Sequence, residues 1–111
     1  MVDAVEDEGN LIVESSIDDA AHTARIALGG ELDLNGVDAV TKEFDALGDQ
    51  GVDTVLVDAS RLTFLDSSGL RALLAGRERL QAKRVRLRVV NASPAIARLL
   101  DMTGTRSMLE D

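Results

Sequence analysis

The stretch Phe64-Leu65-Asp66-Ser67-Ser68-Gly69-Leu70 places two hydroxyl side chains where a strand is predicted to end and a helix to begin. An apolar run from Val52 to Val57 precedes it and is typical of a buried strand. Leucines follow it at helical spacing, at Leu70, Leu73, Leu74 and Leu80. A serine at such a turn caps the helix, and the free N–H groups of the first turn favour an anion. The stretch therefore predicts a strand–turn–helix unit with a candidate phosphorylation site.

The same residues also fit an ordinary helix start, since Asp, Ser and Gly are common in caps and turns. The choice between a cap and a modification site depends on the rest of the chain. A first strand is predicted over 11–17, and alternation of apolar and polar residues predicts two more over 22–28 and 84–89, in addition to 52–57. Helical spacing predicts helices over 37–47, with Asn35 as its cap, and over 70–81.

The C-terminal part begins with Ser93-Pro94, a serine cap followed by proline at the first helical position, and this third helix is expected to end at Gly104. A short last strand is expected over 107–109. Gly29-Gly30 is expected to end the second strand, and residues 1–10 to form a flexible acidic tail. The order β-β-α-β-α-β-α-(β) predicts an α/β fold, a mixed sheet with helices packed mainly on one face.

Composition restricts the classes of partner. The chain has 111 residues, enough for one domain, and a net charge of −8 that opposes nucleic-acid phosphates. Its only aromatic residues are two phenylalanines, so stacking on bases is not expected. It has no cysteine, no signal-peptide pattern and no apolar run near the ~20 residues that span a bilayer. We expect a protein of the cytoplasm that inserts into no membrane.

Catalytic and metal sites are poorly supported. A serine hydrolase needs a base, and the only histidine is His22, in an early strand. Asp33, Asp58 and Asp66 could gather near strand ends in a loose magnesium site, but loop carboxylates are also ordinary caps. The arginines at 84, 86 and 88 could hold an acidic partner or form the solvated side of a strand. We therefore expect no enzyme activity, metal or cofactor.

Three segments share a further pattern: Gly30-Glu31-Leu32-Asp33, the stretch 64–70, and the run from Ser93 to Gly104. In this order and spacing they resemble the STAS domain family, and within it the bacterial anti-sigma factor antagonists, also called anti-anti-sigma factors. The resemblance covers roughly residues 11–110, so a STAS domain is expected over 11–111. The element order predicted above also fits that family's fold.

The resemblance implies partner switching. The unphosphorylated antagonist binds an anti-sigma factor that is also a serine kinase, and a sigma factor is released. The kinase uses ATP to phosphorylate the first serine of the turn, here Ser67, the antagonist dissociates, and a metal-dependent serine phosphatase restores it. By the same resemblance the docking surface comprises Asp33, Asn35, Asp66, Ser68 and Gly69, with Gly69 allowing close approach of the partner.

A second role on the same fold stays open at this point. A STAS domain can be a non-phosphorylated subunit of a membrane transport complex or a signalling scaffold. The complete Asp66-Ser67-Ser68-Gly69 turn favours the switch, although a serine can also persist there as a cap. The sequence leaves the oligomeric state and the identity of the sigma factor open.

Overall fold

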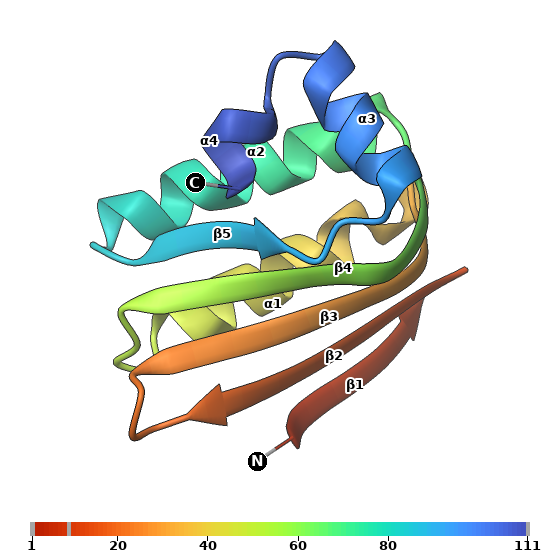
Figure 1. Ribbon diagram of the computed structural model, residues 1–111. Coiled ribbons are helices and arrows are strands. Elements are labelled where there is room, and N and C mark those ends of the chain that lie inside the picture. Colours follow the sequence, from red (N-terminus) through yellow and green to blue (C-terminus); the bar gives the residue numbers. More distant parts are fainter. Residues whose placement is uncertain (1, 9, 111) are drawn as a thin grey trace.

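The structure, a computed structural model, describes residues 2–8 and 10–110. One mixed sheet contains its five strands in the order β1-β2-β3-β4-β5 (Figure 1). They are β1 (Val2–Glu8), β2 (Leu11–Asp18), β3 (Thr23–Leu32), β4 (Thr54–Leu65) and β5 (Arg86–Val90). Strand β2 runs antiparallel to both of its neighbours, whereas β3, β4 and β5 are mutually parallel. The predicted α/β fold with a mixed sheet is confirmed.

The helices connect the parallel strands and pack on one face of the sheet (Figure 1). They are the 3₁₀ helix η1 (Leu34–Gly36), α1 (Val37–Gly48), α2 (Ser67–Ala82), α3 (Pro94–Met102) and α4 (Arg106–Glu110). Parallel neighbours need such a crossover, and α1 and α2 supply it before β4 and β5. The core lies between these helices and the sheet.

The predicted alternation is confirmed in two strands. Ala24, Ile26 and Leu28 of β3 are buried, and so are Val85, Leu87 and Val89 in and just before β5. The helical stripes are also buried where they were expected, with Phe44 of α1 and Leu73 of α2 among the largest enclosed side chains. Burial of these apolar surfaces is the main favourable contribution to folding.

The predicted acidic tail is wrong for residues 2–8, which form β1; Met1 and Gly9 lie outside the described residues. Strand β1 pairs antiparallel with β2, and Glu8 lies opposite Leu11. Without β1, the outer edge of β2 would present unpaired N–H and C=O groups. Backbone pairing to such an edge requires little apolar character in the added strand. The dipeptide Gly9-Asn10 is of a type that joins hairpin strands, and it was the overlooked indication.

The expected last strand over 107–109 is also wrong, because this segment lies in α4. The Leu109 N–H donates to the Thr105 carbonyl at 3.1 Å, and Leu109 is completely buried. Arg106 forms ion pairs with Asp101 and with Glu110, the latter one helical turn away. Pairs at this spacing stabilise a short helix.

Both central strands extend further than the sequence predicted. Strand β3 continues through Gly29-Gly30 to Leu32, and β4 continues to Leu65, with register shifts that act as bulges in their pairing. Gly30 has φ +86°, and a Cβ there would lie 2.0 Å from the Asn10 carbonyl oxygen. Only glycine fits this bulge, so here the glycine bends the strand without ending it.

Candidate functional site

The C-terminal ends of β3 and β4 bring the predicted site residues together. The two strands are parallel neighbours, and Leu32 at the end of one lies opposite Leu65 at the end of the other. Asp33 and Asp66 are the next residues along the two strands, so both begin loops at the same edge of the sheet. The structure therefore brings these two loops side by side.

Asp66, and not a serine, caps α2. Its backbone is extended, with φ −100°, and its Oδ1 accepts a hydrogen bond from the Gly69 N–H at 2.8 Å. Its carbonyl accepts from the Leu70 N–H at 2.9 Å. The sequence analysis assigned the cap to a serine and began the helix at Leu70, whereas the helix begins at Ser67. An aspartate caps as well as a serine, and its negative charge also suits a helix N-terminus.

Because Asp66 provides the cap, Ser67 is not needed for it. Ser67 is exposed in the first turn of α2, and its side chain makes no hydrogen bond to any of the described residues. Ser68 is half-buried. Of the two hydroxyls in the turn, that of Ser67 is the more accessible to another molecule.

Gly69 is buried, and its role is internal. A Cβ on Gly69 would lie 2.3 Å from the Leu32 carbonyl oxygen and 2.8 Å from the Leu65 Cδ1 atom. The start of α2 therefore packs directly on the end of β3, and the Asp66 N–H also donates to the Leu32 carbonyl, at 3.4 Å. The sequence analysis expected Gly69 to allow close approach of a partner, whereas the close approach is to the chain's own backbone.

Asp33 organises the neighbouring loop. It is half-buried at the N-terminus of η1, and its Oδ1 accepts from the Asn35 N–H at 3.0 Å. Asn35 is exposed within η1 and does not cap α1, whose N-cap residue is Gly36 without a side-chain hydrogen bond. The expected Asn35 cap is wrong because an additional turn of 3₁₀ helix separates the loop from α1.

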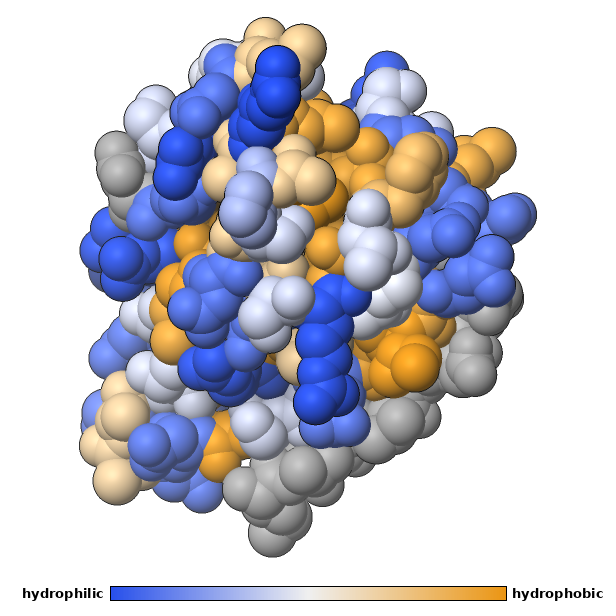
Figure 2. Space-filling view, turned by 45° about the vertical axis from the view of Figure 1, so that its right-hand side comes forward, coloured by the Kyte–Doolittle hydropathy of each residue, from blue (hydrophilic) through white to orange (hydrophobic). Residues whose placement is uncertain are grey.

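Two exposed hydrophobic side chains border this edge, and the sequence analysis did not single them out as site residues. Leu34, directly after Asp33, is 72% exposed, and Phe64, near the end of β4, is 47% exposed. Figure 2, which turns this edge toward the reader, shows hydrophobic residues among hydrophilic ones. Leu34 is an apolar residue within a polar loop of the sequence, and this contrast could have indicated an exposed hydrophobic residue of the site. We call Asp33, Leu34, Phe64, Asp66 and Ser67 the switch edge.

The third aspartate of the tentative magnesium site lies elsewhere. Asp58 is on the sheet face opposite the helices, where its carboxylate pairs with Arg25 of β3 at 2.6 Å. Burial raises the pKa of this carboxyl group, but hydrogen bonds from Ser60 and Arg25 outweigh that effect, and its pKa is lowered overall. Among residues 10–110, whose side chains the structure describes, no three potential metal ligands lie close enough to hold an ion.

The arginines at 84, 86 and 88 do not form a single stripe. Arg84 lies before β5 with a positive φ of 62°, whereas Arg86 and Arg88 are exposed on the strand itself. The Arg88 Nε donates to the Glu110 carbonyl at 2.9 Å. At least one of these side chains therefore holds α4 in place.

Comparison with known proteins identifies the family. The family model described as "Mlab, STAS domain" matches residues 15–110. The chain belongs to the STAS domain family. Among the described residues of this STAS domain, no helix has the length and apolar character needed to cross a membrane.

Several relatives of this STAS domain are anti-sigma factor antagonists. The anti-sigma F factor antagonist of Paenibacillus polymyxa is 32% identical over 80 residues, which cover 71% of this chain and 68% of that protein. The unphosphorylated form of the anti-sigma factor antagonist SpoIIAA superposes with a TM-score of 0.74 and 27% identity, over 89% of this chain and 86% of that one.

The phosphorylated form of SpoIIAA, described as a Bacillus cell fate determinant, gives a TM-score of 0.67 at 27% identity over 89% of each chain. The relatives are named for antagonising another protein, which agrees with the prediction of a regulatory, non-enzymatic domain.

Proposed function

We propose that this STAS domain is an anti-sigma factor antagonist that binds an anti-sigma factor with serine kinase activity through the switch edge. Binding occurs while Ser67 is unmodified and leads to release of a sigma factor in the cytoplasm. The kinase phosphorylates Ser67, the complex separates, and a serine phosphatase restores the binding form. The exposed Ser67 hydroxyl at the start of α2, left free because Asp66 caps the helix, is the observation that supports this proposal most.

The proposal has a simple physical basis. A phosphate adds about −1.5 to −2 charges, and at a helix N-terminus it is accommodated without cost to the fold. At the switch edge, Asp33 and Asp66 already carry negative charge, so a phosphate on Ser67 adds repulsion and a group that must be desolvated on docking. If phosphorylation of Ser67 and binding of the partner are coupled by about 1–3 kcal/mol, phosphorylation lowers the affinity for the partner about 5- to 150-fold. The related SpoIIAA exists in an unphosphorylated and a phosphorylated form, which supports the analogy.

The test is phosphorylation by the cognate anti-sigma kinase with ATP, followed by mass spectrometric mapping. We expect one phosphate on Ser67, no labelling of Ser67→Ala, and full labelling of the matched control Ser68→Ala. Phosphate on Ser68 would reassign the acceptor. A chain that binds the partner but is never labelled would instead indicate the non-phosphorylated STAS role.

Calorimetry of the same complex measures the contribution of Asp33. The Asp33→Asn variant keeps a side-chain oxygen for the Asn35 N–H and removes only the charge. If Asp33 pairs with a positively charged side chain of the partner, the substitution weakens binding by about 1–3 kcal/mol when the pair is desolvated. The loss is smaller when the pair stays exposed to solvent at the rim of the interface. Unchanged affinity would restrict Asp33 to its capping role, which the asparagine retains.

A further inference from the structure

Arg71 follows Ser67 by four residues on α2 and has no partner of its own. Its side chain is exposed and forms no hydrogen bond or ion pair with any residue that the structure describes. The side chains three and four positions away on the helix carry no charge, and they are those of Ser67, Ser68, Leu74 and Ala75. Arg71 is therefore a free cation whose polar neighbours within one turn of α2 are the two serines at the start of the helix.

The neighbouring helix does not supply the missing acid. Two ion pairs join α1 to α2, and in both the acid precedes the base by 34 positions in the chain: Asp45–Arg79 and Asp49–Lys83. The same offset leads from Arg71 to Val37, the first residue of α1, which carries no charge. The adjacent Asp38 is exposed and forms no ion pair with Arg71. The row of pairs between the two helices thus stops before it reaches Arg71.

The helix geometry places Arg71 within reach of a group attached to Ser67. Residues four positions apart on a helix have Cβ atoms about 5–6 Å apart, and an acid that precedes a base at this spacing is the more favourable order. Long side chains on a helix lean toward its N-terminus, which takes the guanidinium of Arg71 toward Ser67. A phosphate on Ser67 would supply the acid that Arg71 lacks.

We propose that Arg71 binds the phosphoryl group of phosphorylated Ser67 within the same chain. The inference rests on the proposed function, which makes Ser67 the modified residue. A guanidinium presents its N–H donors in a planar fork that matches two phosphate oxygens. The pair offsets part of the charge that the phosphate adds beside Asp33 and Asp66. The modified chain then differs from the unmodified one in the position of Arg71 as well as in charge.

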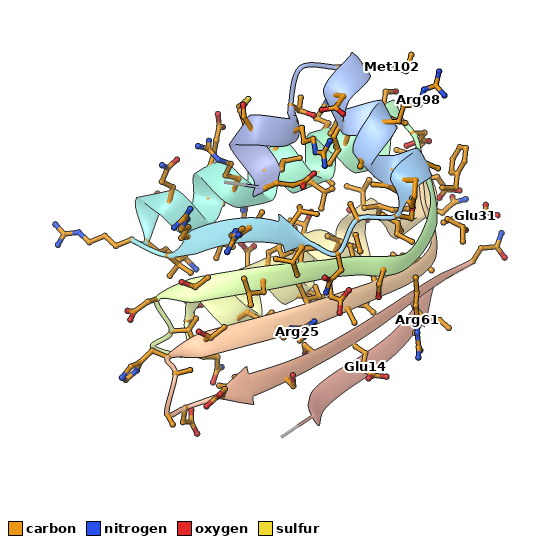
Figure 3. All side chains as sticks on the ribbon, in the orientation of Figure 1. Glu14, Arg25, Glu31, Arg61, Arg98 and Met102 are labelled. Carbon is orange, nitrogen blue, oxygen red and sulfur yellow. The ribbon has the colours of Figure 1, made fainter. Side chains whose placement is uncertain are left out.

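Two other arginines are also exposed and without a partner among the described residues, but their positions differ. Figure 3 shows Arg61 on the sheet face opposite the helices and Arg98 on α3. The sheet separates Arg61 from α2. The approach of Arg98 to Ser67 depends on how two helices pack, whereas that of Arg71 is set by a single turn of one helix. Arg98 is therefore the rival that the experiment has to exclude.

Phosphoserine installed at position 67 by genetic code expansion tests the proposal on the full chain without any kinase. In ³¹P NMR titrations the second pKa of the phosphate, ordinarily about 6, should be higher in Arg71→Gln than in the unsubstituted chain by about 0.3 or more. An i,i+4 pair of single charges changes a pKa by about 0.2–0.4, and a dianion attracts the cation more strongly. Asp33, Asp38, Asp66 and the N–H groups of the first turn also act on this pKa, but they are the same in both chains. The Nε–H resonance of Arg71 should move downfield on phosphorylation.

Arg77→Gln is the matched control, because Arg77 is another arginine of α2 without a partner among the described residues. It lies ten residues from Ser67, about 15 Å along the helix and beyond the screening length of about 8 Å at physiological salt. Arg77→Gln and Arg98→Gln should leave the pKa of the phosphate unchanged. An unchanged pKa in Arg71→Gln, or an equal rise in Arg98→Gln, would overturn the proposal. A cognate kinase that never labels Ser67 would contradict the proposed function alone, since the installed phosphate still decides whether Arg71 binds it.

Discussion

At the scale of single residues, adjacent side chains in one turn divide two tasks. Asp66 holds the first turn of α2 through its bond to the Gly69 N–H, while the Ser67 hydroxyl points to solvent without a structural partner. A group that caps a helix cannot be modified without loss of stability. The division leaves Ser67 free for covalent chemistry at no cost to the fold.

This division gives a prediction for stability. Asp66→Ala removes the cap and should lower the free energy of unfolding by about 1 kcal/mol. Ser67→Ala should change it by no more than about 0.5 kcal/mol, as is usual for surface substitutions. Urea denaturation of both variants measures this difference, with the comparison made where their m-values, the slopes of unfolding free energy against urea concentration, are equal. The control Asp66→Asn retains an acceptor oxygen and should lie close to the unsubstituted protein; equal losses in the two alanine variants would contradict the assignment of the cap.

At this scale the sequence analysis could not choose correctly among neighbouring residues that are all able to cap a helix. Ser93 was predicted as a cap and is one, since its hydroxyl accepts from the Ile96 N–H and Pro94 follows at the first helical position. That start has a single candidate, because proline fixes the position of the helix. In the turn before α2 three consecutive residues could cap, and only the three-dimensional path of the backbone selects Asp66.

At the scale of elements, the parallel pair β3 and β4 organises the molecule. It aligns Asp33 with Asp66 at one end and forms the Arg25–Asp58 pair on the sheet face opposite the helices. The sequence predicted the first halves of both strands, from alternation in β3 and from a short apolar run in β4. It missed the second halves, where Gly29-Gly30 in β3 and the polar Asp58, Ser60 and Arg61 in β4 interrupt the pattern and bulges accommodate the interruption. Bulges depend on the partner strand, which a single segment does not reveal.

The cross-strand pair on these elements predicts a pH dependence. The pKa of Asp58 is lowered in the folded chain, so its charge contributes stability above the ordinary Asp pKa of about 3.9, and this contribution is lost as pH falls through the lower folded value. Asp58→Asn keeps the oxygen that accepts from the Ser60 N–H but removes the charge. It should cost about 0.5–1 kcal/mol between pH 5 and 8, as expected for a partly exposed pair.

Thermal unfolding of both proteins between pH 2 and 8 measures this difference. The two stability curves should converge below the ordinary pKa of aspartate, where the carboxyl group of the unsubstituted chain becomes neutral. Curves that stay parallel down to pH 2 would show that the charge of Asp58 contributes nothing and that the loss is steric.

At the scale of the whole molecule, stability is expected to be uneven across the sheet. Strands β3 and β4 are paired on both sides and carry fully buried residues such as Ile26 and Val55. Strand β1 is paired only with β2, at the edge of the sheet. Backbone hydrogen bonds at such an edge open at a lower free energy than those in the centre.

Native-state amide hydrogen exchange should show this order directly. We expect the slowest exchange in β3 and β4, intermediate rates in β2, and the fastest among the strands in β1. Amides of β1 that exchange as slowly as those of β3 would show that β1 belongs to the same cooperative unit as the central strands.

The pairing of Leu32 with Leu65 also has a consequence for protein synthesis. The two halves of the switch edge lie on either side of α1, so a chain that has left the ribosome only as far as that helix holds Asp33 but not Ser67. The complete edge exists only after β4 and the first turn of α2 have emerged and β4 has docked on β3. A kinase that recognises both loops together would therefore act on finished molecules and leave nascent chains unmodified.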